Sequence, residues 1–126
     1  MLDNSLYTND TERMEIVLNK KELEKDGLTE DSILGPIRSL IFSYGGTEPS
    51  HGIFELSGID TFAIMGSIPG KMVKANPDIL KYFKVWNWYV DGDIENCIEG
   101  MTHYLKEVKP IVDKLMEEAR NDVKQK

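Results

Sequence analysis

The stretch DIENCIEGMTHYLKEVKPIVDKLMEEARNDV, residues 93–123, decides the fold of this chain. Its apolar residues recur at steps of three and four, which is the period of an α-helix. They fill one arc of a helical wheel, and charged or polar residues fill the other arc, as in an amphipathic helix that faces a core. The sequence therefore predicts a long C-terminal helix with Asp93 as its N-cap.

Pro110 lies inside this pattern and does not disturb its phase. Val108 before it and Ile111 after it keep the helical spacing. A proline removes one helical hydrogen bond and bends the helix, but Pro110 falls in the middle of the polar face, where a bend is tolerated. We therefore expect one long kinked helix, and a break at Lys109–Pro110 is the alternative.

The predicted helix is longer than the domain to which it belongs. About 32 residues at ~1.5 Å each give a length of ~48 Å, whereas a domain of this size has a diameter of roughly 36 Å. The apolar residues near the helix end need a cover, and two-fold homodimers are the commonest soluble oligomers. We expect a homodimer whose interface contains Met101, Leu105, Val108, Val112 and Leu115. The alternative is a frayed end beyond Met116.

The rest of the chain predicts four strands. Residues 1–12 are polar and unpatterned and are expected to form a flexible N-terminal arm, followed by a single domain over residues 13–126. Alternating apolar and polar residues predict strands at residues 13–18, 52–57, 61–68 and 84–90. The middle two would form a hairpin. Gly66, in the third strand, leaves a gap that a ring or a backbone can approach closely.

Capping residues predict short helices between these strands. Asn19 begins the first helix, Thr29 or Pro36 begins the second, and Asn76 begins the third. The expected fold class is α+β, with a mostly antiparallel sheet of about four strands packed against the long C-terminal amphipathic helix, and short helices between the strands.

Composition disfavours several classes of function. The net charge is -7, which disfavours binding to nucleic acid backbones and anionic membranes, because phosphates need basic counter-charges. No apolar run approaches the ~20 residues that cross a bilayer, and the N-terminus lacks the features of a secretory signal. The single cysteine, Cys97, lies on the apolar helix face and is expected to be a core residue. We expect a cytoplasmic protein.

The sequence offers few catalytic residues. His103 lies on the polar face of the long helix, and His51 lies in a loop without metal-ligand spacing. There is no nucleophile motif and no phosphate-binding loop. We therefore expect no catalytic residues, no cofactor and no metal, and the alternative is an enzyme built on His51 with Glu48 or Glu55.

The candidate recognition residues are mainly aromatic. Trp86 and Trp88 share one face of their strand, and Tyr89 lies on the other. If exposed, the two tryptophans would anchor an interface or stack on a planar ligand; if buried, they would belong to the core. Arg38 would contact an anion. The predicted ligand-binding residues are Trp86, Trp88, Tyr89, Arg38 and His51.

These features predict a small acidic, non-enzymatic interaction protein that binds and inhibits or sequesters a partner, of the inhibitor, immunity or mobile-element accessory type. An acidic chain is suited to a basic partner, because opposite charges speed encounter. The alternative is a protein that binds or sequesters a nucleotide-like small molecule in a pocket at a homodimer interface.

Overall fold

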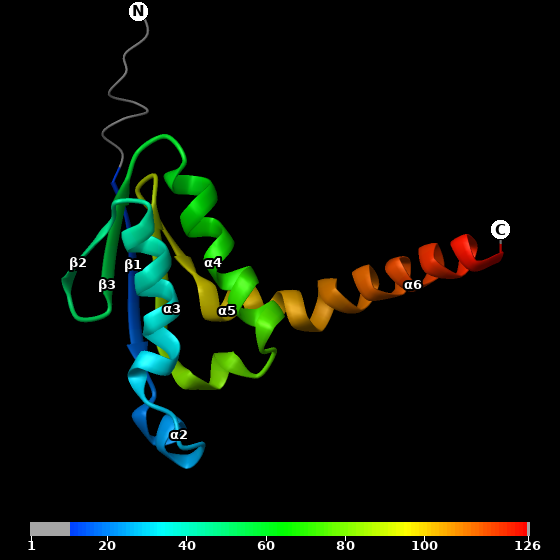
Figure 1. Ribbon diagram of the computed structural model, residues 1–126, viewed down its shortest axis with the longest axis horizontal. Helices are drawn as coiled ribbons and strands as arrows, with labels where there is room; N and C mark the ends of the chain where they lie inside the picture. Colours follow the sequence, from blue (N-terminus) through cyan, green and yellow to red (C-terminus); the bar gives the residue numbers. More distant parts are fainter. Residues whose placement is uncertain (1–10, 126) are drawn as a thin grey trace, which may run out of the picture.

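The sheet is built around its first strand. In a computed structural model, which describes residues 11–125 and the side chains as far as Asp122, β1 (Thr11–Leu18) lies at the centre of a five-stranded sheet ordered β2-β3-β1-β4-β5 (Figure 1). β3 (Ile53–Ser57) and β4 (Phe83–Val90) flank it, and β2 (Thr47–Ser50) and β5 (Asp93–Asn96) form the edges. All neighbouring strands are antiparallel.

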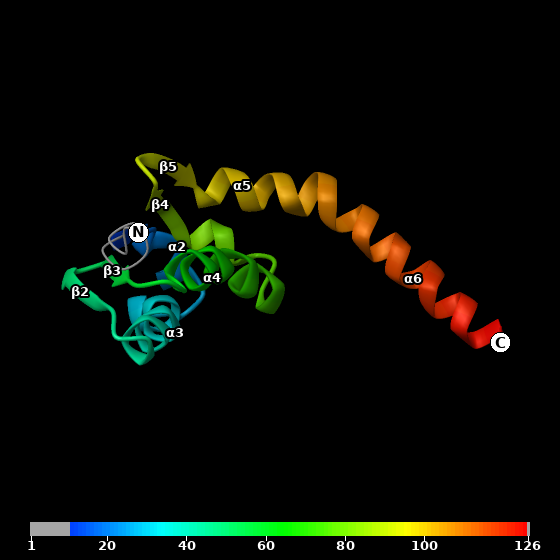
Figure 2. The ribbon, with the colours of Figure 1, turned by 90° about the horizontal axis from the view of Figure 1, so that it is seen from above.

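Two helical crossovers link these strands. α2 (Lys20–Lys25) and α3 (Glu30–Ser43) connect β1 to β2, and α4 (Thr61–Ala75) with the 3-10 helix η1 (Ile79–Tyr82) connects β3 to β4. Each crossover joins two parallel strands that have another strand between them, which is a split β-α-β arrangement. α3 and α4 lie on the same side of the sheet (Figure 2).

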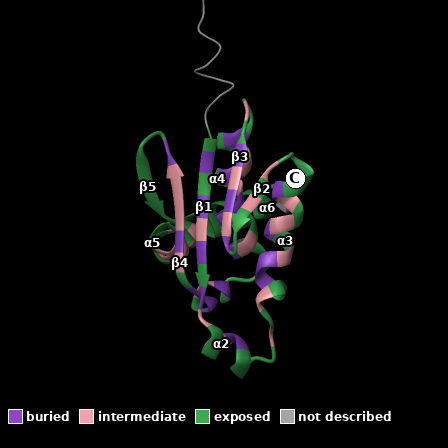
Figure 3. Ribbon diagram, turned by 90° about the vertical axis from the view of Figure 1, so that its left-hand side faces the viewer, coloured by how far each residue is buried: buried purple, intermediate pink, exposed green. Residues whose placement is uncertain are grey.

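The core lies between the sheet and these two helices. Met14, Ile16 and Leu18 of β1 alternate with residues that are exposed or half-buried, so one sheet face is covered and the other is open (Figure 3). Phe54 of β3 and Trp86 of β4 are fully buried on the covered face. Helix residues complete this core with Ile33, Leu34, Ile37, Ile41, Met65, Ile68 and Val73.

The C-terminal helix runs without interruption and is kinked, as predicted. α5 (Cys97–His103) continues through one π-helical turn, η2 (Tyr104–Val108), into α6 (Lys109–Gln125). The backbone N–H of Lys109 donates to the carbonyl of Tyr104, a bond one residue longer than in an α-helix, as π-turns have. The helix bends between α5 and α6, and α6, whose second residue is Pro110, projects away from the sheet (Figure 2).

The predicted fold class is confirmed, with five strands. The layer that covers the sheet, however, is made by α3 and α4 instead of the long helix. The C-terminal helix adds only its first turns to the core, through Cys97, Ile98, Met101 and Leu105. Its remaining length leaves the globule because the sheet face is already filled.

Several local predictions were wrong. Asn76 ends α4 as its C-cap, and the expected third helix is the 3-10 helix η1, which begins at Ile79. Residues 61–68 form the first half of helix α4 instead of a strand. The hairpin is instead β2–β3, with its turn at His51 and Gly52. Asp93 begins β5, and Asn96 caps the long helix by accepting the backbone N–H of Glu99 at 3.1 Å.

The predicted N-terminal arm ends two residues too late. Thr11 and Glu12 belong to β1, and residues 1–10 lie outside the described residues. Over residues 11–125, no helix combines the length and the hydropathy needed to cross a bilayer.

Candidate functional site

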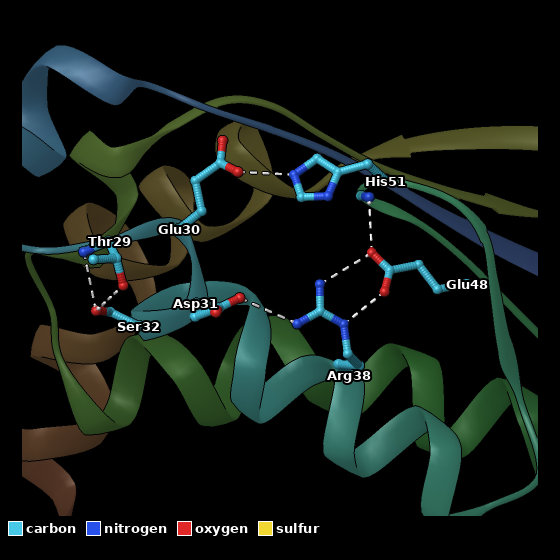
Figure 4. A network of polar contacts seen from close by, with 8 residues as sticks. Thr29, Glu30, Asp31, Ser32, Arg38, Glu48 and His51 are labelled. Carbon is cyan, nitrogen blue, oxygen red and sulfur yellow. Dashed lines mark hydrogen bonds and ion pairs between the residues drawn. The ribbon is translucent and has the colours of Figure 1, made fainter.

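A charged network ties the β2–β3 hairpin to α3 (Figure 4). The Arg38 guanidinium holds both carboxylate oxygens of Glu48, with Nε at 2.6 Å from Oε1 and Nη2 at 3.2 Å from Oε2. The Glu48 side chain is only 12% exposed. Its hydrogen bonds with Arg38 keep the pKa of Glu48 below the ordinary value and raise the pKa of Arg38. Two-point contact of this kind fixes geometry as well as charge.

The hairpin turn completes the network. The backbone N–H of Gly52 donates to Oε2 of Glu48 at 3.0 Å, and His51 Nε2 lies 2.8 Å from Oε2 of Glu30. Gly52 has φ +77°, and a Cβ there would lie 2.4 Å from the carbonyl oxygen of Ile16. The turn therefore requires glycine, and the network holds it against the helix.

Arg38 and His51 thus both have carboxylate partners. Arg38 also contacts Asp31 through Nη1 at 3.3 Å. An arginine that is already held by two carboxylates supplies little net positive charge for a ligand anion. The arrangement is one that stabilises the fold.

The two tryptophans lie on the covered face of the sheet. Trp86 has no exposed surface and stacks on Phe83, with ring centroids 4.2 Å apart and an interplanar angle of 13°. Trp88 lies at the margin of the core, where its indole N–H donates to Oε1 of Glu12 at 2.7 Å. Its ring packs against α4, 5.2 Å from the ring of Phe62 and directly over Gly66.

Tyr89 lies on the open face, away from both tryptophans. Its hydroxyl donates to Oε1 of Glu15 at 2.9 Å, and this bond raises the pKa of Tyr89. The five predicted ligand-binding residues therefore occupy three separate places: the core and its margin, the open sheet face and the α3–hairpin network. They do not line one pocket.

The predicted dimer residues divide into two groups along the C-terminal helix. Met101 and Leu105 pack partly against the core of their own domain. Val108, Val112 and Leu115 are 38%, 41% and 59% exposed. They belong to an apolar stripe that no other described segment covers, and this helix stripe consists of Val108, Ile111, Val112, Leu115 and Met116.

The open face of the sheet carries a second set of apolar side chains. Val17 is paired with Val85 across β1 and β4, and Tyr89 is paired with Ile94 across β4 and β5. Val17 is 45% exposed and Ile94 60% exposed. No helix among residues 11–125 packs on this open-face cluster of Val17, Val85, Tyr89 and Ile94.

The described residues offer little for nucleophilic or metal chemistry. Burial raises the pKa of the Cys97 thiol to about 12, so the reactive thiolate is scarce at neutral pH. Within residues 11–125 no group of three or more His, Cys, Asp or Glu side chains could hold a metal ion.

One candidate site was missed from the sequence. A groove of about 400 Å³ runs between α3 and α4, with Leu40 and Met72 among the residues that line it. Its α4 wall begins inside residues 61–68, which were predicted to form a strand. The steps of three and four between Met65, Ile68 and Met72 were the signal that would have identified α4 as a helix.

Comparison with known proteins gives no relative from which a function could be transferred. No protein-family model matches the chain, and searches of curated proteins and of solved structures gave no significant match.

Proposed function

We propose that this protein is a non-enzymatic interaction protein that works as a homodimer, joined through its C-terminal helix, and that binds and inhibits or sequesters a partner protein. The observation that carries the proposal is the helix stripe. Its five large apolar residues lie on a helix that projects from the domain, and each is at least 38% exposed. Exposed apolar patches of this kind mark interaction sites.

The spacing of the stripe suits a second copy of the same helix. Val108, Val112 and Leu115 follow one another at steps of four and three, as in the seven-residue repeat of a coiled coil. Ile111 and Met116 broaden the stripe on both sides. Pro110 falls on the opposite side of the helix, so it leaves the seam free.

The partner would dock on the open-face cluster. That surface combines exposed apolar side chains with carboxylates such as Glu15 and Glu55, and Glu55 is held by Arg13 at 2.9 Å. With a net charge of -7, the protein favours a partner that is basic around an apolar centre. A cytoplasmic location belongs to the same proposal, since the only cysteine is a buried core residue.

Native mass spectrometry of the purified chain over a range of concentrations tests the assembly. We expect a dimer for the wild type and a monomer for Leu115→Asp, because the aspartate places a charge in the seam. Asn121→Asp is the matched control, since it adds the same charge at an exposed position outside the stripe. A wild-type monomer at every concentration, or a dimer unaffected by Leu115→Asp, would contradict the proposed interface.

A second experiment tests the partner surface. Proteins retained by the immobilised wild type are identified, purified and mixed with each variant, and the mass of the complex is measured. Val17→Asp should abolish the complex while leaving the dimer intact, and Asn121→Asp should leave both unchanged. A purified partner that binds Val17→Asp as tightly as the wild type would exclude the open face.

A further inference from the structure

We propose that the groove between α3 and α4 binds a small aliphatic carboxylate. This site is separate from the helix stripe and from the open-face cluster. Its volume of about 400 Å³ lies in the range of about 300–1,000 Å³ that is typical of ligand pockets. The two helices that form it lie side by side over the same sheet face (Figures 1 and 2).

The groove is apolar along its floor and walls. The floor consists of Ile37, Ile68 and Ile79, which are 1%, 2% and 7% exposed. Pro36 and Leu40 of α3 form one wall, and Met72 of α4 forms the other. Rigid buried isoleucines fix the shape of the floor, and a flexible methionine lets the wall adapt to a chain.

The polar side chains of the groove favour an anion. Among the described residues, 11–125, no carboxylate lines the groove, although the chain as a whole is acidic. Lys71 lines the groove and makes no ion pair with any described residue. Asn76, at the end of α4, uses Oδ1 to accept the backbone N–H of Asp78 at 3.0 Å, which leaves its NH₂ as a donor.

This combination selects one class of ligand. An exposed lysine with no described ion-pair partner, among the residues that line an apolar groove, complements a molecule with one negative charge and a hydrocarbon chain. No aromatic ring from the described part of the chain lines the groove, so a nucleotide base would have no ring there to stack on, and one lysine is too little for a polyphosphate. The carboxylate would contact Lys71 and Asn76, and the chain would lie over the isoleucine floor.

Isothermal titration calorimetry of the full chain with octanoate tests the proposal. We expect one saturable site per chain, no detectable binding of acetate, and binding of octyltrimethylammonium at least about tenfold weaker, since its charge is opposite. Lys71→Gln should weaken octanoate binding about tenfold or more, the worth of one charge-assisted hydrogen bond.

Matched variants separate this groove from other surfaces. Lys74→Gln removes a neighbouring lysine that does not line the groove, and it should leave the affinity unchanged. Ala75→Trp places a ring at an exposed lining position and should block the site. Leu115→Asp should not affect octanoate binding, because the helix stripe is elsewhere.

Four results would overturn the proposal: no binding of octanoate, equal binding of octyltrimethylammonium, an affinity unchanged by Lys71→Gln, or loss of binding in Leu115→Asp. Circular dichroism of each variant confirms that the fold is retained. Failure of octanoate to bind leaves the dimer proposal intact, because that proposal is tested by mass and rests on different residues.

Discussion

α4 and α6 are both amphipathic helices with an internal proline, and yet their apolar faces have opposite environments. In α4, Met65 and Ile68 are 0% and 2% exposed, because the sheet covers them. In α6, Leu115 and Met116 are 59% and 58% exposed. Periodicity thus predicts that a helix has an apolar face but not what covers that face. Similar apolar side chains on α4 and α6 must therefore contribute differently to the free energy of unfolding of the monomer.

The largest contrast is expected from truncating one apolar residue on each helix. Met65→Ala should lower the free energy of unfolding by about 2–5 kcal/mol, since it leaves a cavity in a filled core. Leu115→Ala, at a protein concentration low enough to keep the chain monomeric, should change it by less than about 0.5 kcal/mol. Urea unfolding followed by circular dichroism measures both. Equal effects would mean that α6 packs on its own domain.

A similar contrast in burial separates two ion pairs of the domain. Arg38→Ala should destabilise the fold by about 1–3 kcal/mol, because it leaves the poorly exposed carboxylate of Glu48 without its main partner. The matched control is Arg13→Ala, whose pair with Glu55 has side chains 54% and 29% exposed and should contribute below about 1 kcal/mol. If the two variants unfold at the same urea concentration, the network has no special role.

The Arg38–Glu48 pair also predicts a pH dependence. The pKa of Glu48 is lowered in the folded state, so the pair stabilises the fold above the ordinary carboxyl pKa. That contribution disappears as the pH falls through the lowered value. Between about pH 5 and about pH 3 the wild type should therefore lose more stability than Arg38→Ala. Parallel unfolding midpoints for the two proteins over this range would exclude the pair as the cause.

Two helical glycines sharpen the comparison at a smaller scale. Gly100→Ala in the C-terminal helix should stabilise by about 0.5–1 kcal/mol, because a Cβ there meets nothing within 4 Å. Gly66→Ala in α4 should destabilise by about 1 kcal/mol, since its Cβ would lie 3.0 Å from Cη2 of Trp88, a ring that Glu12 holds in place. Thermal melts distinguish the two signs, and stabilisation by both alanines would show that the Trp88 ring moves freely.

The smallest effect is expected on α6 itself. Lys109 Nζ lies 2.6 Å from Oδ2 of Asp113, with side chains 40% and 60% exposed. Removing this pair in Lys109→Ala should cost less than about 0.5 kcal/mol, as for other exposed pairs one helical turn apart. A larger loss in urea unfolding would indicate that the pair fixes the kink next to Pro110.

The sequence predicts most reliably the elements whose local signals agree. The alternation of β1, the cap at Asn19 and the continuity of the helix across Pro110 each match the structure. Residues 61–68 failed because β-branched and aromatic residues, with a glycine among them, resemble a strand over so short a window. In the folded protein, packing of this segment on the sheet stabilises the helix. The inference that a ring approaches Gly66 was nevertheless correct, although the element was not.

The candidate sites could be predicted less well than the fold. The exposed stripe could be predicted, because the length of the C-terminal helix can be counted in the sequence. The Arg38 network and the groove depend on the distance between α3 and its neighbours, which no local pattern encodes. β5 could have been predicted from Asp91 and Gly92, because Asp-Gly between two strands is a strong hairpin signal. In the structure both residues have positive φ, as such a turn requires.

The two edge strands have a consequence for how the protein associates. β2 and β5 are four residues long; β2 contains Pro49, which has no N–H to donate, and β5 exposes Asp93 and Glu95. Short, charged or proline-containing edges resist the addition of another strand. The sheet is therefore protected against edge-to-edge aggregation. Any partner, including a second copy, gains little from main-chain pairing and must be recognised through side chains.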